Sequence, residues 1–555
     1  MAGGNGVNVF KILRGDEPKA IFNWRLWFAV CSFGLMGAAR GIDEGLIAGV
    51  VASSQFQSLV GIADRNAAEA ASIKGNIVAM VNIGSVGGAI IAFFICDRIG
   101  RLWATRQLCL VWMIGIAIFM GNNGSLGAVY AGRFIAGLGV GQTTVVAPVY
   151  LAEISPPSVR GLATCFFTGA VYLGIVLSYF ANYGCALHFP EGYARWEVPT
   201  SLHLIFAGLI LMLSFFNYES PRYFIKAGQP QLALENLCRL RQLPEDDKYI
   251  KDEIEAINTS LQVELEATMG LGFIGFLKEM FLIPGNLYRI YIGVTGQLLS
   301  QWSGGPSITV YALNLFAILG ITGSGESLLS TAVFGVVKLI SAFICALFLV
   351  DIVGRKMSLL AGISLQAIAI VYIAIYLTIV PTIAKSSAPS INGSSSAGRA
   401  GIGAIVCIFV SGFGWAMGWN SMQYLLTAEL FPLRIRAAST SLVMCVHFLN
   451  SYANSRAVPV MLLPTTAGGL SPAGTFWFFS AITIIGGLWV WLTIPETSGR
   501  RLESIDELFS LPWYKIGLHG NKIADENNRN KLDGNSAILA EKKLDVQHEE
   551  TKEKV

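Results

Sequence analysis

The sequence of 555 residues is poor in charged side chains. They make up 14% of the chain, whereas a typical soluble domain carries about 25%. The 39 basic and 36 acidic residues nearly cancel, so the charge balance gives no reason to expect a nucleic acid or another polyanion as a partner. A soluble globular domain is therefore excluded.

Residues of the kinds that bind metals or do covalent chemistry are also few. The five histidines and nine cysteines are scattered and lack the spacing of a metal site. The apolar segments contain no nucleophile paired with a base and no phosphate-binding loop. We therefore expect no enzyme activity, no metal and no cofactor.

Apolar residues, by contrast, form 53% of the chain and gather in long runs. A run of about 20 apolar residues can cross a bilayer as a helix. Twelve such spans are predicted, near residues 26–51, 76–95, 102–121, 127–151, 163–185, 200–217, 287–319, 327–350, 357–380, 400–428, 437–463 and 474–494. The chain is therefore expected to be an all-α membrane protein of twelve helices, with the lipid bilayer as a partner.

One short motif occurs twice. Asp97-Arg98-Ile99-Gly100-Arg101 follows the second span, and Asp351-Ile352-Val353-Gly354-Arg355-Lys356 follows the eighth. An internally repeated membrane chain is typical of transporters. The predicted organisation is an N-terminal segment (1–25), a six-helix bundle (26–217), a central loop with short helices (218–285), a second six-helix bundle (286–494) and a tail (495–555).

The basic residues occur in alternate connections between the spans, and these connections lie on the same side as both termini. Lys and Arg are enriched in cytoplasmic connections, so both termini are expected in the cytoplasm.

The motifs, in their order along the chain, resemble the sugar porter family of the major facilitator superfamily, and most of all its fungal proton-coupled branch. The motifs concerned are Gly41-Ile42-Asp43, Asp97 to Arg101, Gly132-Arg133, Tyr150 to Glu153 with Arg160-Gly161, Glu219-Ser220-Pro221-Arg222, Glu429 to Pro432, and Pro495 to Arg500. The resemblance implies two six-helix bundles around a central cavity that opens to each side in turn. It also implies the plasma membrane of a fungus.

Charged groups near the cytoplasmic helix ends are expected to form a gate. Carboxylates and arginine forks from neighbouring bundles can bond when the inner face is closed and separate when it opens. The alternative is that these charges only orient the loops during insertion. The expected gate residues are Arg101, Glu153, Arg160, Glu219, Arg222, Arg355, Glu429, Arg434 and Glu496.

Ionisable groups deep within a span are costly, and they usually pair or touch the transport path. Arg40 precedes Asp43 and Glu44 by three and four positions, which places all three on one helix face. The resemblance implies that Asp43 carries the proton and that Arg133 is its partner. A static salt bridge is the alternative.

Polar stripes on otherwise apolar spans predict a cavity that binds a polyhydroxylated solute, although such residues also bond between helices. Several positions where typical hexose porters bind sugar differ here, so ordinary glucose recognition is not expected. The candidate substrate-binding residues are Arg40, Thr168, Gln297, Ser300, Gln301, Lys338, Asn420, Tyr424 and His447.

The buried charges favour an anionic substrate. Arg40, Arg133 and Lys338 exceed Asp43 and Glu44 by one positive charge, which a carboxylate would balance. The expected function is therefore proton-coupled import of a sugar acid or cyclitol acid, such as galacturonate or quinate. The alternatives are a neutral hexose or pentose symporter, a uniporter and a sugar sensor that does not transport. The charge argument fails if Arg40 only pairs with Glu44 and Lys338 only reaches a helix-end carbonyl.

Overall fold

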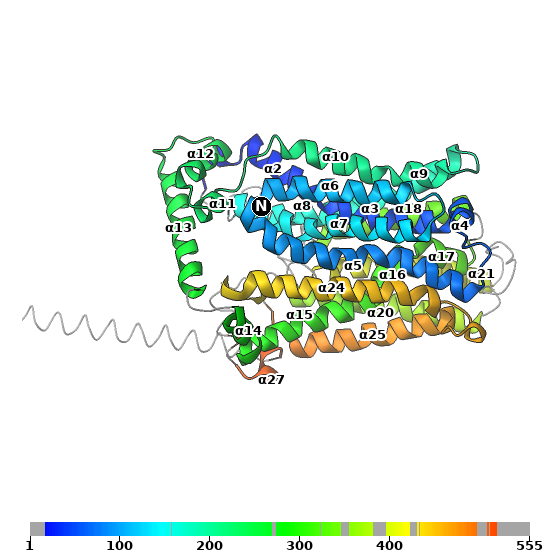
Figure 1. The fold of residues 1–555 in the computed structure, drawn as a ribbon. Coiled ribbons are helices and arrows are strands. Elements are labelled where there is room, and N and C mark those ends of the chain that lie inside the picture. Colours follow the sequence, from blue (N-terminus) through cyan, green and yellow to red (C-terminus); the bar gives the residue numbers. More distant parts are fainter. Residues whose placement is uncertain are drawn as a thin grey trace, which may run out of the picture.

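The computed structural model describes residues 17–156, 158–268, 273–321, 324–345, 354–380, 396–421, 430–431, 433–496, 508–509 and 511–518. Long helices that run side by side dominate this part of the chain (Figure 1). Nine helical segments of the described chain are long and apolar enough to cross a membrane. The other expected spans coincide with two interrupted helices and with a helix that carries many polar residues, so the all-α architecture is confirmed.

The first six spans begin with two helices that meet end to end, α2 (Trp24–Gly34) and α3 (Gly37–Ala52). The short α4 (Ser54–Leu59) follows them. The next four spans are α5 (Ala67–Ile99), α6 (Arg101–Met120), α7 (Leu126–Ile154) and α8 (Arg160–His188). The sixth span is again divided, into α9 (Ala194–Thr200) and α10 (Leu202–Ser214).

The second group of spans begins with an interrupted span of α15 (Pro284–Trp302), α16 (Gly305–Val310) and α17 (Ala312–Ile318). The first break lies at Gly304, whose φ of +86° is in the left-handed region that favours glycine. The remaining spans are α18 (Ser324–Ile344), α20 (Arg355–Ile379), α21 (Ser396–Met417) with α22 (Trp419–Ser421), α24 (Leu433–Met461) and α25 (Ser471–Thr493).

Each six-helix bundle packs through small residues, and the two bundles meet along two helix pairs. A Cβ on Gly41 of α3 would overlap the carbonyl oxygen of Val171 on α8, so only glycine permits this approach. Between the bundles, α5 lies along α24 and α8 lies along α18. At the far end of the first pair, a Cβ on Gly75 would lie 2.9 Å from the carbonyl oxygen of Arg456.

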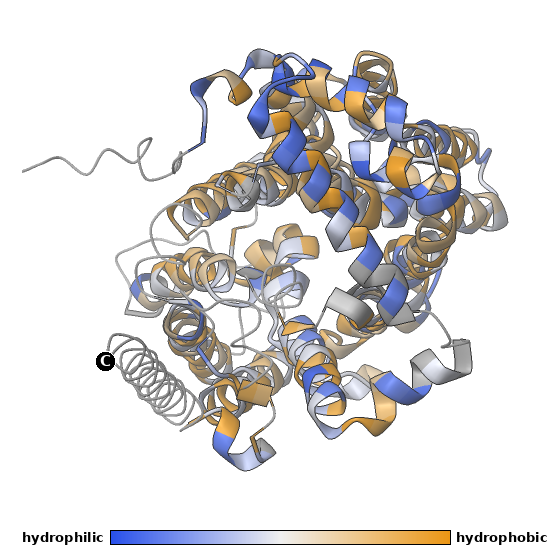
Figure 2. Cartoon of the chain, turned by 90° about the vertical axis from the view of Figure 1, so that its left-hand side faces the viewer, coloured by the Kyte–Doolittle hydropathy of each residue, from blue (hydrophilic) through white to orange (hydrophobic). Residues whose placement is uncertain are grey.

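Large apolar side chains such as Phe94, Ile205 and Ile368 remain exposed on the outside of the helices, as expected of helices surrounded by lipid. The short helices α11 (Pro221–Lys226), α12 (Pro230–Arg241), α13 (Lys248–Thr268) and α14 (Phe273–Leu282) gather at one end (Figure 1). We call this end, where the α5–α6 connection also lies, the basic end. Figure 2 shows hydrophilic residues concentrated on the helices that cross it.

One buried arginine fixes two of these helices, α12 and α13, to the first bundle. Arg241, at the end of α12, donates from Nη1 to the carbonyl oxygen of Ile154 at 2.9 Å. It also donates from Nε and Nη2 to the carboxylate of Glu253 on α13, at 3.0 and 2.6 Å. The amphipathic pattern of residues 229–266 therefore corresponds to two helices, α12 and α13, and Arg241 joins both to α7.

Candidate functional site

A polar cavity lies between the two bundles. It is lined by charged, amide and hydroxyl side chains from both bundles. Helices α3 and α5 of the first bundle supply one wall, and α15, α16 and α24 with Tyr311 supply the other. The lining residues are Arg40, Asp43, Glu44, Ile47, Val78, Val81, Asn82, Gln301, Pro306, Ser307, Val310, Tyr311, Ser451, Asn454 and Ser455.

The expected contact between Asp43 and Arg133 is confirmed. Arg133 on α7 donates from Nη1 to Oδ1 of Asp43 and from Nη2 to Oδ2 at 3.1 Å, so the bond is bidentate. Its Nε donates to the carbonyl oxygen of Ile77 on α5 at 3.2 Å. Both side chains are almost fully buried, and Asp43 borders the cavity. The pair thus stands between the cavity and the interior of the first bundle.

Arg40 and Glu44 form a second ion pair one helical turn away. Arg40 Nε lies 2.7 Å from Glu44 Oε1, and both residues line the cavity. The guanidinium of Arg40 also lies over the ring of Phe448 on α24, 5.6 Å from its centre. Arg40, Asp43 and Glu44 therefore share one face of α3, as expected. The pairing of Arg40 with Glu44 is the one considered above as the alternative to substrate binding by Arg40.

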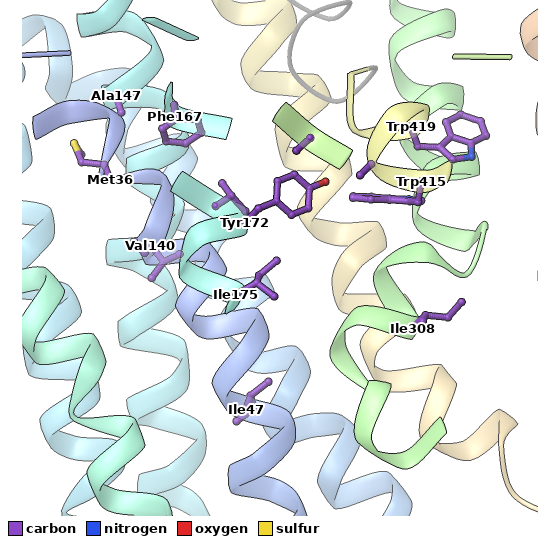
Figure 3. Close-up of a cluster of buried hydrophobic side chains, with 14 of the residues drawn as sticks. Met36, Ile47, Val140, Ala147, Phe167, Tyr172, Ile175, Ile308, Trp415 and Trp419 are labelled. Atoms are coloured by element: carbon purple, nitrogen blue, oxygen red, sulfur yellow. The ribbon is translucent and has the colours of Figure 1, made fainter. Parts of the chain in front are cut away.

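Lys338 on α18 lies away from the cavity lining. Its Nζ donates to the hydroxyl of Thr309 at 2.5 Å, which differs from the helix-end carbonyl considered above. Three aromatic rings surround the ammonium, at 4.8 Å (Trp415), 5.3 Å (Tyr172) and 5.6 Å (Phe334). Figure 3 shows Tyr172 pointing from α8 toward Trp415. Within the described chain, Lys338 makes no ion pair with a carboxylate.

Of the other expected substrate residues, Gln301 lines the cavity and its Oε1 is buried without a hydrogen-bond partner in the described structure. His447 lies behind it, with Nδ1 at 3.3 Å from Gln301 Nε2 and at 2.8 Å from Gln297 Oε1. Gln297 and His447 thus bond between α15 and α24, which is the alternative role for such residues.

The three remaining candidates that the structure describes are not part of the lining. Ser300 donates to the carbonyl oxygen of Gln297 at 3.0 Å, and Thr168 donates to that of Thr164 at 3.5 Å, each within its own helix. Asn420 lies in α22 and is half-buried. Tyr424 lies outside the described residues. A role for these residues in substrate binding stays a prediction.

Arg101 connects three helices at the basic end. Its Nη2 lies 3.0 Å from Asp97 Oδ1 and 2.7 Å from Glu153 Oε1, and its Nη1 donates to the carbonyl oxygen of Cys96 at 3.3 Å. These partners belong to α5 and α7, in the same bundle as Arg101. The expected contact with Glu153 is therefore present, but it joins helices within one bundle and not two bundles.

Glu219 and Glu496 cap two equivalent helices. Glu219 accepts the backbone N–H groups of Arg101 (3.1 Å) and Leu102 (2.9 Å) at the start of α6. Glu496 accepts those of Arg355 (2.9 Å) and Lys356 (3.0 Å) at the start of α20. A carboxylate here satisfies free amides and is favoured by the positive end of the helix.

Glycine precedes both capped helices. Gly100 and Gly354 have φ values of +89° and +97°. A Cβ on either one would lie 2.6 Å from the Oε2 of the capping glutamate. The doubled motif therefore requires glycine for its backbone angle and for the approach of the carboxylate. Burial raises the pKa of Glu219, which the amides and Arg101 oppose.

The remaining expected gate residues are Arg160, Arg222, Glu429 and Arg434. Arg222 is a half-buried residue of α11, while Arg160 and Arg434 belong to the first turns of α8 and α24 and their side chains are not described. Glu429 lies outside the described residues, and so does Asp351, the first residue of the second copy of the doubled motif. Their part in a gate stays a prediction.

The list of candidate residues drawn from the sequence missed several members of the cavity wall. Asn82 on α5 donates to Ser455 on α24 at 3.4 Å, and so bonds across the two bundles. Tyr311 donates to the carbonyl oxygen of Ser455 at 2.5 Å. Gly304 could have indicated that Tyr311 lines the cavity, because unwound segments in membrane proteins line cavities. Asn82 stands among small and apolar residues and offered no such signal.

Two six-helix bundles with a polar cavity between them, and a buried ion pair at the wall of that cavity, define a carrier of the major facilitator type. Comparison with known proteins agrees, since residues 29–509 match the family model described as "Sugar (and other) transporter". The chain belongs to this family of transporters, and like its relatives it is not an enzyme.

Among curated relatives, a probable quinate permease of Aspergillus flavus is 30% identical over 93% of this chain and 94% of its own length. A probable quinate permease of Aspergillus niger is 30% identical over 89% of each chain.

Among solved structures, the proton:xylose symporter XylE bound to 6-bromo-6-deoxy-D-glucose has a TM-score of 0.71. It is 23% identical, over 87% of this chain and 99% of that one. XylE from E. coli in a partially occluded inward-open conformation has a TM-score of 0.69 at 21% identity, over 86% and 100% of the two chains. At these identities the two structures support the fold alone.

Proposed function

We propose that this transporter imports a sugar acid or cyclitol acid, with quinate as the first candidate, together with a proton. Import occurs by alternating access across the plasma membrane. The basic end faces the cytoplasm, because cytoplasmic connections are rich in Lys and Arg, and both termini lie there. Residues 26–217 and 286–494 are the two moving units, and residues 218–285 connect them on the cytoplasmic side.

The observation that carries the coupling is the bidentate pair of Asp43 and Arg133 at the cavity wall. An ionised Asp43 holds Arg133, whereas a protonated Asp43 releases it. Because Arg133 also bonds to Ile77 of α5, its release from Asp43 separates α3 from a unit that α7 forms with α5. A proton from the cavity can thereby shift the balance between two arrangements of the bundles.

Two features of the cavity support a carboxylated polyol. Gln301 presents a buried acceptor with no partner in the described protein, next to Ser451 and Asn454 on the wall. Lys338, which makes no ion pair within the described chain, adds a positive charge near the site, whereas Arg40 and Arg133 each pair with a carboxylate. The names of the relatives point to quinate, which has several hydroxyl groups and one carboxylate.

The test measures uptake of radiolabelled quinate into proteoliposomes that contain the full chain. Asp43→Asn imitates the protonated state, so we expect accumulation driven by a pH gradient to be lost while exchange of internal for external quinate remains. Glu69→Gln, which changes an exposed carboxylate of the Arg65–Glu69 pair outside the cavity, serves as the control. Accumulation by Asp43→Asn with ordinary pH dependence contradicts the proposed role of Asp43.

A neutral sugar is the second candidate, and the Arg40–Glu44 pair favours it, because Glu44 already compensates the charge of Arg40. A competition experiment separates the two candidates. Quinate, galacturonate, glucose and xylose are each added in excess during uptake of a labelled member of the set. Competition by the acids alone supports the carboxylate proposal, and competition by the neutral sugars alone supports the second candidate.

A further inference from the structure

The ion pair of Arg40 and Glu44 is exposed to the cavity, unlike the pair behind it. The side chains of Arg40 and Glu44 are 11% and 27% exposed, whereas those of Arg133 and Asp43 are 2% and 6% exposed. Arg40 Nε lies 2.7 Å from Glu44 Oε1 in the first pair. A molecule in the cavity can therefore reach Glu44 and its guanidinium partner directly.

Arg40 also connects the two walls. It belongs to α3 of the first bundle, and its guanidinium lies over the ring of Phe448 on α24 of the second. An arginine held against an aromatic face keeps its plane fixed and can still offer its N–H groups to a carboxylate. Arg40 is thus a positioned anion-binding group that Glu44 occupies.

The net positive charge around this pair favours the binding of an additional anion. Lys338 lies near this pair, because its ammonium donates to Thr309 of α16, and the same helix lines the cavity through Ser307 and Val310. Arg40 and Lys338 together exceed Glu44 by one positive charge, and Arg133 is already engaged with Asp43. A substrate carboxylate would bring this group of three to neutrality while Glu44 stays ionised.

We propose that Glu44 determines specificity as the built-in competitor of the substrate carboxylate for Arg40. The inference rests on the proposed function and gives a role to a residue that had none. A substrate anion replaces Glu44 on the guanidinium of Arg40. A neutral polyol cannot replace a carboxylate on an arginine at comparable free energy, so Glu44 excludes it from this position.

The experiment measures equilibrium binding of radiolabelled quinate to the purified full-length protein, with unlabelled quinate methyl ester as the neutral competitor. Glu44→Gln keeps the shape of the side chain and removes its charge. We expect it to tighten quinate binding about tenfold, corresponding to about 1.4 kcal/mol, and to change the affinity for the ester by less than about twofold. Arg40→Gln should weaken quinate binding by at least about tenfold.

The double variant tests whether Glu44 acts through Arg40. In the Arg40→Gln background, Glu44→Gln should no longer improve quinate binding, because the group for which the two carboxylates compete is absent. Glu69→Gln removes the acidic partner from another pair at i,i+4 spacing, outside the cavity, and should leave both affinities unchanged. A merely structural role of Glu44 would alter binding of acid and ester alike.

Each result decides the matter. Tighter quinate binding to Glu44→Gln supports the proposal, including the case in which only this variant binds quinate. The proposal is overturned alone if the wild type binds quinate and Glu44→Gln leaves the affinity unchanged, lowers it or improves ester binding equally. If neither protein binds quinate while xylose or glucose binds, both this proposal and the carboxylate substrate are overturned.

Discussion

Replacing Gly100 with alanine should destabilise the protein by two separate effects. With a φ of +89° and a ψ of 166°, Gly100 lies in a backbone region that is essentially restricted to glycine, and an alanine there costs about 1–3 kcal/mol. The new Cβ would lie 2.6 Å from Glu219 Oε2, so this oxygen has to withdraw from the amide of Leu102. A buried amide left without its acceptor costs about 1–3 kcal/mol, which brings the total to about 2–6 kcal/mol.

The assay is thermal unfolding of the purified protein in detergent, followed by its intrinsic tryptophan fluorescence. Gly228→Ala is the matched control, because Gly228 has a φ of +74° and open space where its Cβ would lie. It should show the backbone cost alone, so its Tm should fall clearly less than that of Gly100→Ala. Gly354→Ala should resemble Gly100→Ala, since Glu496 Oε2 is equally close there.

The reasoning also predicts that the two residues depend on each other. In a Glu219→Ala background the steric conflict is absent, so Gly100→Ala should then lower Tm by clearly less than it does in the wild-type background. If Gly100→Ala is as mild as Gly228→Ala in the wild-type background, the capping carboxylate does not contribute as the geometry requires.

Three further outcomes are expected. Arg101→Ala removes the bonds to the ends of α5 and α7, so a membrane-permeant maleimide should label the buried Cys96 faster and leave Cys109, deep in α6, unlabelled; equal labelling of Cys96 would count against this clamp. Burial raises the pKa of Glu219, so its ionised form is less favourable in the folded than in the unfolded chain. The protonated form of Glu219 therefore contributes stability that is present at low pH and is lost as pH rises through the raised pKa. Glu219→Gln should gain in Tm relative to the wild type as pH rises. A loss in Tm relative to the wild type over the same pH range would refute the direction of the pKa shift. One carboxylate moved with one proton carries no net charge, so a potential worth about 2.3 kcal/mol per charge per 100 mV should not alter quinate accumulation, whereas a pH gradient should drive it by about 1.4 kcal/mol per unit. A clear dependence on potential in proteoliposomes would exclude this stoichiometry.

Much of the fold followed from the sequence because lipid leaves few alternatives. A run of about 20 apolar residues in a bilayer has to satisfy its own backbone, and a helix does so. The expected spans therefore coincide with helices even where the helix is interrupted, as at Gly304. The break between α2 and α3 was not expected, since Leu35 and Met36 carry no signal that stops a helix.

The site was predictable where residue type restricts the partner. Asp43 and Arg133 are buried charges of opposite sign, and their contact was expected and is present. Glu219 was expected to bond to an arginine side chain, but a sequence does not show which backbone amides lie free near a carboxylate. The environment of Lys338 was equally hidden, because its three rings come from α8, α18 and α21.

The two capping glutamates have a mechanical consequence. Glu219 follows the last helix of the first bundle and Glu496 follows the last helix of the second, yet each is bound to the third span of its own bundle. In each bundle the segment after the sixth span is thereby tied to the start of the third span. Such a tie resists shear among the helices that it joins, so under the proposed alternating access each bundle would turn as a unit. The hinge of the proposed cycle would then be the seam along α5–α24 and α8–α18, and α5 and α24 of this seam also line the cavity.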